Sequence, residues 1–341
     1  MRVTRGTDIV VGDWPTSPEV VAVLECSGAL LAWDVLADAA VPAARVHDPE
    51  RASEWLWEVY GEAADRILGG AAEVEVSGPA DGRVRDACRR AAQLNWAEAW
   101  WPASVTAGVP PLDPVLLHAE LAVALSTVEH LLDDPDAVER ALRSVVPLDV
   151  PTSDPDLDAL AEQVTALAED YGVASAPAEV PSRAGFALAA GGVGLAGTTA
   201  LSGTSTVDWT LVPHGVVDAA APARWAVVRR QGSTVLEVSV VPGPRPGARL
   251  AARFDQVEVA LDGVDEAGWI TGSAPVSAAV LLLLPPQRRV LTVYAPDFAD
   301  PAALDPTAPD PGAEPRRAAI ISYARSRTTS PAATLTERRA R

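Results

Sequence analysis

The sequence contains no lysine, and all 27 of its basic residues are arginine. Alanine and valine are abundant, so we attribute this bias first to GC-rich coding in a bacterium and only second to bidentate anion binding by guanidinium groups. Aromatic residues are scarce at 5%, but 10 of the 17 are tryptophan. This skew predicts a few large anchors in a core of small aliphatic side chains.

Cysteine is nearly absent: Cys26 and Cys88 are the only two, and their spacing matches no metal or redox motif. Each lies in an apolar or amphipathic run, which predicts reduced, buried thiols. The N-terminus has no apolar stretch of the signal-peptide kind, so we expect a cytoplasmic protein.

Residues 184–201 carry no charge, but they are mostly alanine, glycine and threonine. A buried strand, a glycine-rich loop and a membrane segment are all open here, and the weak hydrophobicity disfavours the membrane. Residues 192–197 also match G-x-G-x-x-G, the phosphate-binding loop of dinucleotide sites. The expected β structure after this motif does not suit a dinucleotide fold, so we predict no cofactor.

Charge is distributed unevenly along the chain, whose net charge is −19. Residues 1–182 carry −21, residues 183–315 carry −4, and residues 316–341 carry +6. The acidic body argues against nucleic-acid binding, which depends on neutralising phosphate charge. The basic tail predicts contact with an acidic surface, either the protein's own helical domain or a partner.

Helical signals dominate between residues 48 and 171. Asp-Pro pairs at three positions have the form of a helix N-cap followed by proline in the first turn. Residues 20–35 instead predict a short β-hairpin or one apolar helix. The predicted helices are 48–68, 82–101, 113–132, 134–146 and 157–171.

The hydrophobic period changes to two after residue 182. Residues 224–241 read as a hairpin around a polar turn, with Trp225 and Val227 on one face. Further strands are needed to stabilise such a hairpin. The predicted strands are 207–212, 223–229, 234–241, 249–261, 268–271, 276–284 and 290–295.

These patterns predict an α+β protein. A mainly helical domain spans residues 1–175, with a possible short β-hairpin at its start. An antiparallel β-sandwich or barrel-like domain follows at 183–300. Residues 301–341 form a Pro/Asp-rich linker and a basic tail, in which 316–327 can form a short helix.

Catalytic and metal-binding patterns are not evident. His118 and His130 lie on one predicted helix but point about 120° apart, so they cannot share a metal. No serine stands in a G-x-S-x-G elbow, and neither cysteine has a base placed beside it by a motif. We predict no metal site, and the sequence does not decide whether the protein is an enzyme.

Two groups of residues are candidates for partner binding. Trp96, Trp100 and Trp101 form the densest aromatic cluster, and they are either core anchors or an aromatic recognition surface. The arginines of the tail form the second group, which comprises Arg316, Arg317, Arg325 and Arg327.

We therefore expect a protein-interaction or scaffolding component of a larger assembly, with a protein partner and with nucleic acid and membranes disfavoured. The alternative is an enzyme of unknown class whose site lies in the cleft between the two domains.

Overall fold

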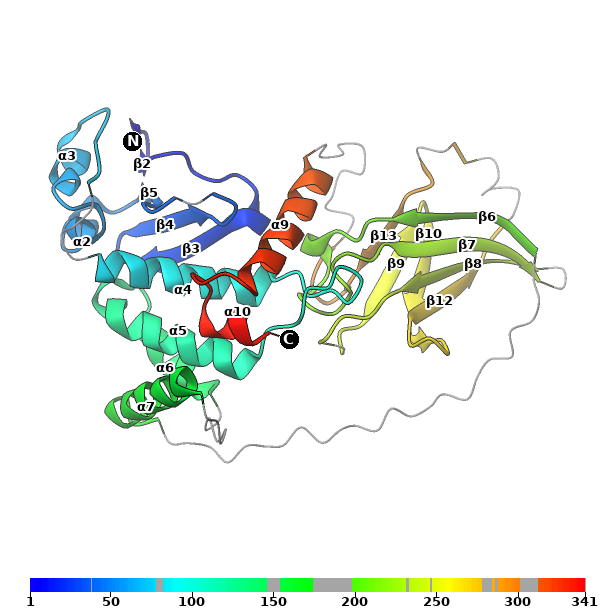
Figure 1. The fold of residues 1–341 in the computed structure, drawn as a ribbon. Helices are drawn as coiled ribbons and strands as arrows, with labels where there is room; N and C mark the ends of the chain where they lie inside the picture. Colours follow the sequence, from blue (N-terminus) through cyan, green and yellow to red (C-terminus); the bar gives the residue numbers. More distant parts are fainter. Residues whose placement is uncertain are drawn as a thin grey trace. The chain divides into compact units, whose positions relative to one another are not determined.

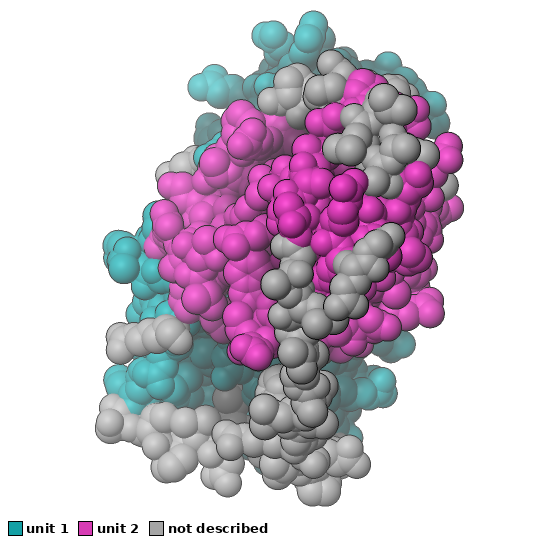
Figure 2. Space-filling model, turned by 90° about the vertical axis from the view of Figure 1, so that its right-hand side faces the viewer, with its two compact units in different colours: residues 1–100, 112–180, 326–341 teal, residues 101–111, 181–325 magenta. Residues whose placement is uncertain are grey.

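The computed structural model describes residues 1–37, 39–77, 82–145, 154–173, 198–230, 233–245, 247–277, 284–285, 288–300 and 312–340. These residues form helices and antiparallel sheets, which confirms the predicted α+β class (Figure 1). They gather into two compact units, coloured separately in Figure 2. Unit 1 contains residues 1–100, 112–180 and 326–341, and unit 2 contains residues 101–111 and 181–325.

Both units are therefore discontinuous in sequence, whereas the predicted domains, 1–175, 183–300 and 301–341, are continuous. The chain enters unit 2 twice, first through the eleven residues 101–111. The predicted limits remain a proposal about which parts of the chain fold independently.

Unit 1 begins with a five-stranded antiparallel sheet in the order β1-β2-β5-β4-β3. The prediction of a mainly helical N-terminus is wrong for this stretch, although the hairpin predicted at residues 20–35 is confirmed as β3–β4. Strands of three or four residues bury too few side chains to show a period in the sequence. The strands are β1 Val3–Arg5, β2 Ile9–Val11, β3 Val21–Cys26, β4 Ala29–Asp34 and β5 Ala43–Val46.

Helices follow the sheet. α4 packs against β3 and β4, α5 packs on α4, and α6, α7 and α10 pack on α5 (Figure 1). The described helices and 3₁₀ turns of this unit are η1 Pro18–Val20, α1 Pro49–Ala52, α2 Leu56–Tyr60, α3 Ala63–Gly69, α4 Arg83–Trp100, α5 Pro114–Val128, η2 Glu129–Leu131, α6 Ala137–Arg143, α7 Pro155–Asp170 and α10 Leu335–Arg339.

Two of the three predicted Asp caps are confirmed. The Asp48 carboxylate accepts hydrogen bonds from the first turn of α1, and Asp113 does the same for α5. Asp134 does not cap α6, whose N-cap is Asp136. The single helix predicted at 48–68 is three short helices, because Gly61 has a φ of +58° and ends α2.

Unit 2 contains two antiparallel sheets, with strand orders β11-β12-β8-β7-β6 and β10-β9-β13. The predicted hairpin at 224–241 is confirmed as the pair β7–β8. The elements are β6 Thr198–Ser205, η3 Trp209–Leu211, β7 Ala223–Arg230, β8 Ser233–Val240, β9 Leu250–Phe254, β10 Val257–Leu261, β11 Gly263–Val264, β12 Ile270–Pro275, β13 Leu291–Tyr294 and most of α9 Ala313–Arg327.

Other strand predictions require correction. The strand predicted at 207–212 is not formed, and Trp209–Leu211 within it form the 3₁₀ turn η3. The long strand predicted at 249–261 is a hairpin, because Asp255 adopts a φ of +53° and reverses the chain between β9 and β10. β6 was not predicted, and most of the strand predicted at 276–284 lies outside the described residues.

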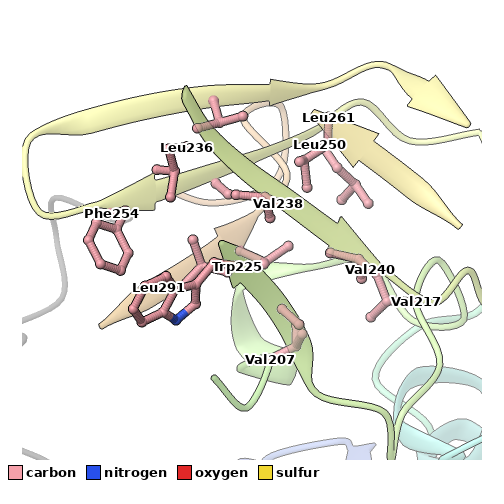
Figure 3. Close-up of a cluster of buried hydrophobic side chains, with 14 of the residues drawn as sticks. Val207, Val217, Trp225, Leu236, Val238, Val240, Leu250, Phe254, Leu261 and Leu291 are labelled. Carbon is pink, nitrogen blue, oxygen red and sulfur yellow. The ribbon is translucent and has the colours of Figure 1, made fainter. Parts of the chain in front are cut away.

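One hydrophobic core joins the two sheets of unit 2 (Figure 3). Trp225 on β7 and Phe254 on β9 belong to this core, with ring centroids 4.6 Å apart. Each large apolar side chain buried in this way contributes about 1.5–3 kcal/mol relative to exposure. Glycine is required at Gly203, the cross-strand partner of Trp225, because a Cβ atom there would lie 2.6 Å from the indole ring.

Candidate functional site

The three clustered tryptophans do not share one surface. Trp96 is 3% exposed, and its indole nitrogen donates to the Glu19 carbonyl at 2.9 Å within unit 1. Trp101 is 1% exposed in unit 2 and donates to the Pro110 carbonyl at 2.9 Å. Trp100 is half-buried at the end of α4. Burial of two of the indoles supports core anchoring over an aromatic recognition surface.

The segment 101–111 is held in unit 2 by a network around Asp218. This side chain is 2% exposed, and it accepts hydrogen bonds from the Ser104 hydroxyl at 2.7 Å and the Thr106 amide at 3.2 Å. The amides of Ala220 and Ala221 donate to the same carboxylate oxygen as Ser104. Ser104 and Asp218 therefore hold the segment in unit 2, and Ser104 is not positioned as a nucleophile.

The protonation state of Asp218 is set by two opposing effects. Burial favours the neutral acid, but the hydrogen bonds from Ser104 and from the three backbone amides outweigh it and lower the pKa of Asp218. Asp218 is therefore a carboxylate at neutral pH.

The four candidate arginines lie on α9. Arg317 stacks over the Trp209 ring at 4.5 Å and donates to the Val207 carbonyl, and Arg325 donates to the Ala107 carbonyl. All of these contacts lie within unit 2. Arg316 is half-buried on the same helix.

Arg327 belongs to unit 1, where it forms a buried ion pair with Glu337 at 2.6 Å. Three of the four candidates therefore make specific contacts within their own units. None of these contacts tests their predicted role with a partner.

The end of the tail is the helix α10, docked on unit 1. The buried carboxylate of Glu120 on α5 accepts hydrogen bonds from the amides of Leu335 and Thr336, at 2.9 and 2.7 Å. The Thr336 hydroxyl donates to the same carboxylate at 2.6 Å. Arg338 and Arg339 pair with Asp156 and Asp154, at 3.0 and 2.9 Å. The acidic surface met by the tail is thus the start of α7.

Two histidine side chains lie beside carboxylates. The imidazole of His118 lies 2.9 Å from a Glu98 carboxylate oxygen, and the imidazole of His130 lies 2.9 Å from a Glu58 carboxylate oxygen.

Cys26 and Cys88 are fully buried and unpaired, which confirms the predicted buried thiols. Burial raises the pKa of Cys26, and it raises the pKa of Cys88 to about 12 with help from Glu58. Neither thiol is a reactive thiolate at neutral pH.

Within the described ranges, no group of three or more His, Cys, Asp or Glu side chains is arranged to hold a metal ion. None of the helices described here is long and apolar enough to cross a membrane. The G-x-G-x-x-G match at 192–197 and most of the uncharged stretch 184–201 lie outside the described residues.

The outer face of the five-stranded sheet in unit 2 is polar. Cross-strand partners share a face, so the strand pairing aligns two rows of side chains over it. A groove of about 880 Å³ follows these rows. One row is Thr204, Arg224, Ser239, Thr271 and Gly263, and the other is Ser202, Ala226, Glu237 and Ser273.

Charged groups at this face are tied to neighbours. The Arg224 guanidinium lies 4.4 Å from the centroid of the Trp269 ring, and Arg230 pairs with Glu237 at 2.5 Å. Both members of the ion pair are about one-third exposed, so it adds at most about 1 kcal/mol of stability. The carboxylates of Asp262 and Asp265 also line the groove, and its other polar side chains are hydroxyl groups of serine and threonine.

β6 forms one edge of this sheet. In the part of the chain that the structure describes, it pairs with β7 on one side and with no strand on the other. Its first three residues are exposed, and none of its eight residues is charged or proline. An exposed edge strand without these features is a template for pairing with another strand.

Sequence reasoning missed this edge because Thr-Thr-Ala-Leu-Ser-Gly-Thr-Ser has only one large apolar residue and shows little hydrophobic period. Three threonines among eight residues were the available signal, since β-branched residues favour strands. Glu120 and α10 were missed as well. The capping-box pattern Thr334-Leu-Thr-Glu337 could have identified α10.

No family model, curated protein or solved structure has significant similarity to this chain.

Proposed function

We propose that this protein is an interaction or scaffolding component of a larger assembly, and that β6 receives an extended segment of a partner protein. The observation that carries the proposal is the exposed, uncharged edge of β6. No single arrangement of the described residues supports the enzyme alternative.

The backbone of β6 supports this mode of binding. Amide and carbonyl groups on the outer side of an edge strand are satisfied best by the backbone of another strand. The side chains of β6 are small, so a partner strand can approach closely along the edge. A regular partner strand has to accommodate the register shift between Thr199 and Leu201.

The polar face beside the edge supports selectivity. A strand added to β6 extends both rows of side chains, placing alternate side chains next to Ser202 and Thr204. The hydroxyl groups of these residues then hydrogen-bond to polar side chains of the partner. Backbone pairing supplies affinity, and this face supplies the choice of partner.

The architecture of unit 2, the location of the protein and its classes of partner are part of the same proposal. Two sheets share one core, so we propose that unit 2 is a β-sandwich. We further propose a cytoplasmic location, with a protein partner and without nucleic acid or membrane binding, as the acidic composition suggests. The contacts of α10 with α7 supply an acidic surface for the tail within the chain itself.

The test is site-specific photo-crosslinking in the native cell. A photoreactive amino acid replaces Ser202 on β6 or, as the matched control, Ser239 on the same face of the doubly paired strand β8. We expect a discrete crosslinked protein from position 202 and much less from position 239. Adding Thr204→Lys is expected to weaken the 202 crosslink roughly ten-fold, because lysine on an edge disfavours strand pairing.

Two outcomes contradict the proposal. Crosslinking to a second copy of this chain means that the edge serves self-association. Equal crosslinking from both positions, unaffected by Thr204→Lys, means that the face rather than the edge makes the contact.

A further inference from the structure

The groove over the outer face of the five-stranded sheet in unit 2 is distinct from the edge of β6. Its volume of about 880 Å³ lies within the range of small-molecule sites, roughly 300–1,000 Å³. Its lining residues come from all five strands, β6, β7, β8, β12 and β11, four of which are labelled in Figure 1. Five neighbouring strands span about 19 Å, so the groove is longer than one sugar ring.

Small residues keep the groove open. Ala226 on β7 and Gly263 on β11 both line it. A Cβ atom at Gly263 would lie 2.9 Å from the hydroxyl oxygen of its cross-strand partner, Thr271. Glycine at this position therefore leaves the Thr271 hydroxyl accessible from the groove.

The hydroxyl groups that line the groove have unused hydrogen-bonding capacity. Each can donate one hydrogen bond and accept others. Among the residues that the structure describes, none forms a hydrogen bond with them. Neighbouring strands lie about 4.8 Å apart, so the hydroxyls form a spaced array over the sheet. They belong to Ser202, Thr204, Ser239, Thr271 and Ser273.

The charged groups of the groove do not favour a charged ligand of either sign. Two arginines and three carboxylates line it. Arg230 pairs with Glu237, so these two charges compensate each other. The remaining charges are those of Arg224, Asp262 and Asp265. An anion meets two carboxylates for one guanidinium, and a cation meets that guanidinium.

The groove also offers little apolar surface. Trp225 and Val238 line it, but their side chains belong to the hydrophobic core on the other face of the sheet. Ala226 and Val264 are the aliphatic side chains that remain in the lining. Burial of apolar area therefore contributes little to binding here, and hydrogen bonding has to supply most of it.

We propose that this groove binds a neutral oligosaccharide. A saccharide carries a hydroxyl group on most of its carbon atoms, so it can hydrogen-bond to an array of serine and threonine hydroxyls. Asp262 and Arg224 add charge-assisted hydrogen bonds to sugar hydroxyls. A site built from polar groups rejects analogues that lack the matching hydroxyls. The groove lies beside β6, and its ligand does not rest on the proposed strand pairing.

A glycan array probed with the fluorescently labelled full chain tests the class of ligand. The array carries neutral oligosaccharides of glucose, mannose, galactose and N-acetylglucosamine, together with sulfated and sialylated oligosaccharides. We expect discrete binding to neutral members and no binding that requires sulfate or sialic acid. Isothermal titration calorimetry then measures the affinity of the neutral oligosaccharide that binds best.

Variants of β12 and β11 locate the site away from the edge strand. Thr271→Val and Ser273→Ala are each expected to weaken binding about two- to ten-fold, because each removes a neutral hydrogen bond. Gly263→Ala is expected to weaken it as well, because the added methyl group meets the Thr271 hydroxyl. Thr234→Val, on the opposite face of β8, is the matched control and is expected to bind as the wild type does.

Circular dichroism establishes that the variants fold. The site is disproved if no neutral oligosaccharide on the array binds, or if binding occurs only with sulfated or sialylated members. It is also disproved if the Thr271→Val/Ser273→Ala double variant binds the selected oligosaccharide as the wild type does. The crosslink from position 202 is expected to persist in this double variant, so the failure of either proposal is seen separately from that of the other.

Discussion

At the scale of single residues, the buried carboxylate of Asp218 anchors residues 101–111 in unit 2. Its lowered pKa means that folding favours the charged form. The stabilisation is complete above the unfolded-state pKa of about 3.9 and is lost as the pH falls through the lower folded-state pKa.

We expect Asp218→Asn to destabilise the protein at pH 7 by about 1–3 kcal/mol, because charge-assisted hydrogen bonds to Ser104 and to the backbone are weakened. Urea unfolding at neutral and at acidic pH measures the difference. It should shrink as the pH falls from about 4, where Asp218 of the unfolded chain takes up a proton, through the lower pKa of the folded state. Asp297→Asn, at an exposed pair with Arg249, is the control and should cost less than about 1 kcal/mol. A pH-independent difference would contradict this explanation.

Gly203 offers a second test at this scale. A methyl group at this position meets the Trp225 ring, so we expect Gly203→Ala to cost about 1–3 kcal/mol of unfolding free energy. In a double-mutant cycle with Trp225→Leu, most of this cost should disappear, because the smaller side chain leaves room. Gly69→Ala has open space around it and serves as the control. Full additivity in the cycle would show that contact with the ring is not the cause.

At the scale of elements, α10 depends on one carboxylate from another helix. Thr336→Val removes the hydroxyl donor to Glu120 while keeping the side-chain volume, so we expect a loss of about 1–2 kcal/mol. Faster digestion of the C-terminal segment by carboxypeptidase measures this loss. Thr329→Val, in the exposed part of the same segment, should leave the digestion rate unchanged. Equal rates for Thr336→Val and the wild type would show that Glu120 does not hold the segment.

The elements that the sequence predicted are those with a strong local signal. Asp48 and Asp113 were predicted as caps because an Asp-Pro pair satisfies the first amides of a helix whatever surrounds it. The hairpin β7–β8 was predicted because both of its strands alternate between buried and exposed positions.

The elements that were missed depend on distant contacts. β1, β2 and β6 are short or polar, and each exists because a neighbouring strand pairs with it. The candidate partner-binding residues show the same division between local sequence signals and distant contacts. Trp96, Trp100 and Trp101 were predicted to be either core anchors or an aromatic recognition surface, but the chain passes from unit 1 to unit 2 between Trp100 and Trp101. No local pattern marks such a crossing.

At the scale of the whole molecule, charge and binding sites are divided between the units. Unit 1 carries most of the negative charge, and the proposed partner edge lies in unit 2.

The passage of residues 101–111 through unit 2 has a consequence for synthesis on the ribosome. Asp218 is synthesised more than a hundred residues after its partner Ser104. Residues 101–111 therefore cannot pack in unit 2 until Asp218 has been translated. Unit 1 is completed later still, because Glu120 meets Thr336 only after residue 336 has left the exit tunnel. Unit 1 therefore cannot be completed before unit 2 has been synthesised, and expressing residues 1–180 alone should yield an incomplete, protease-sensitive product.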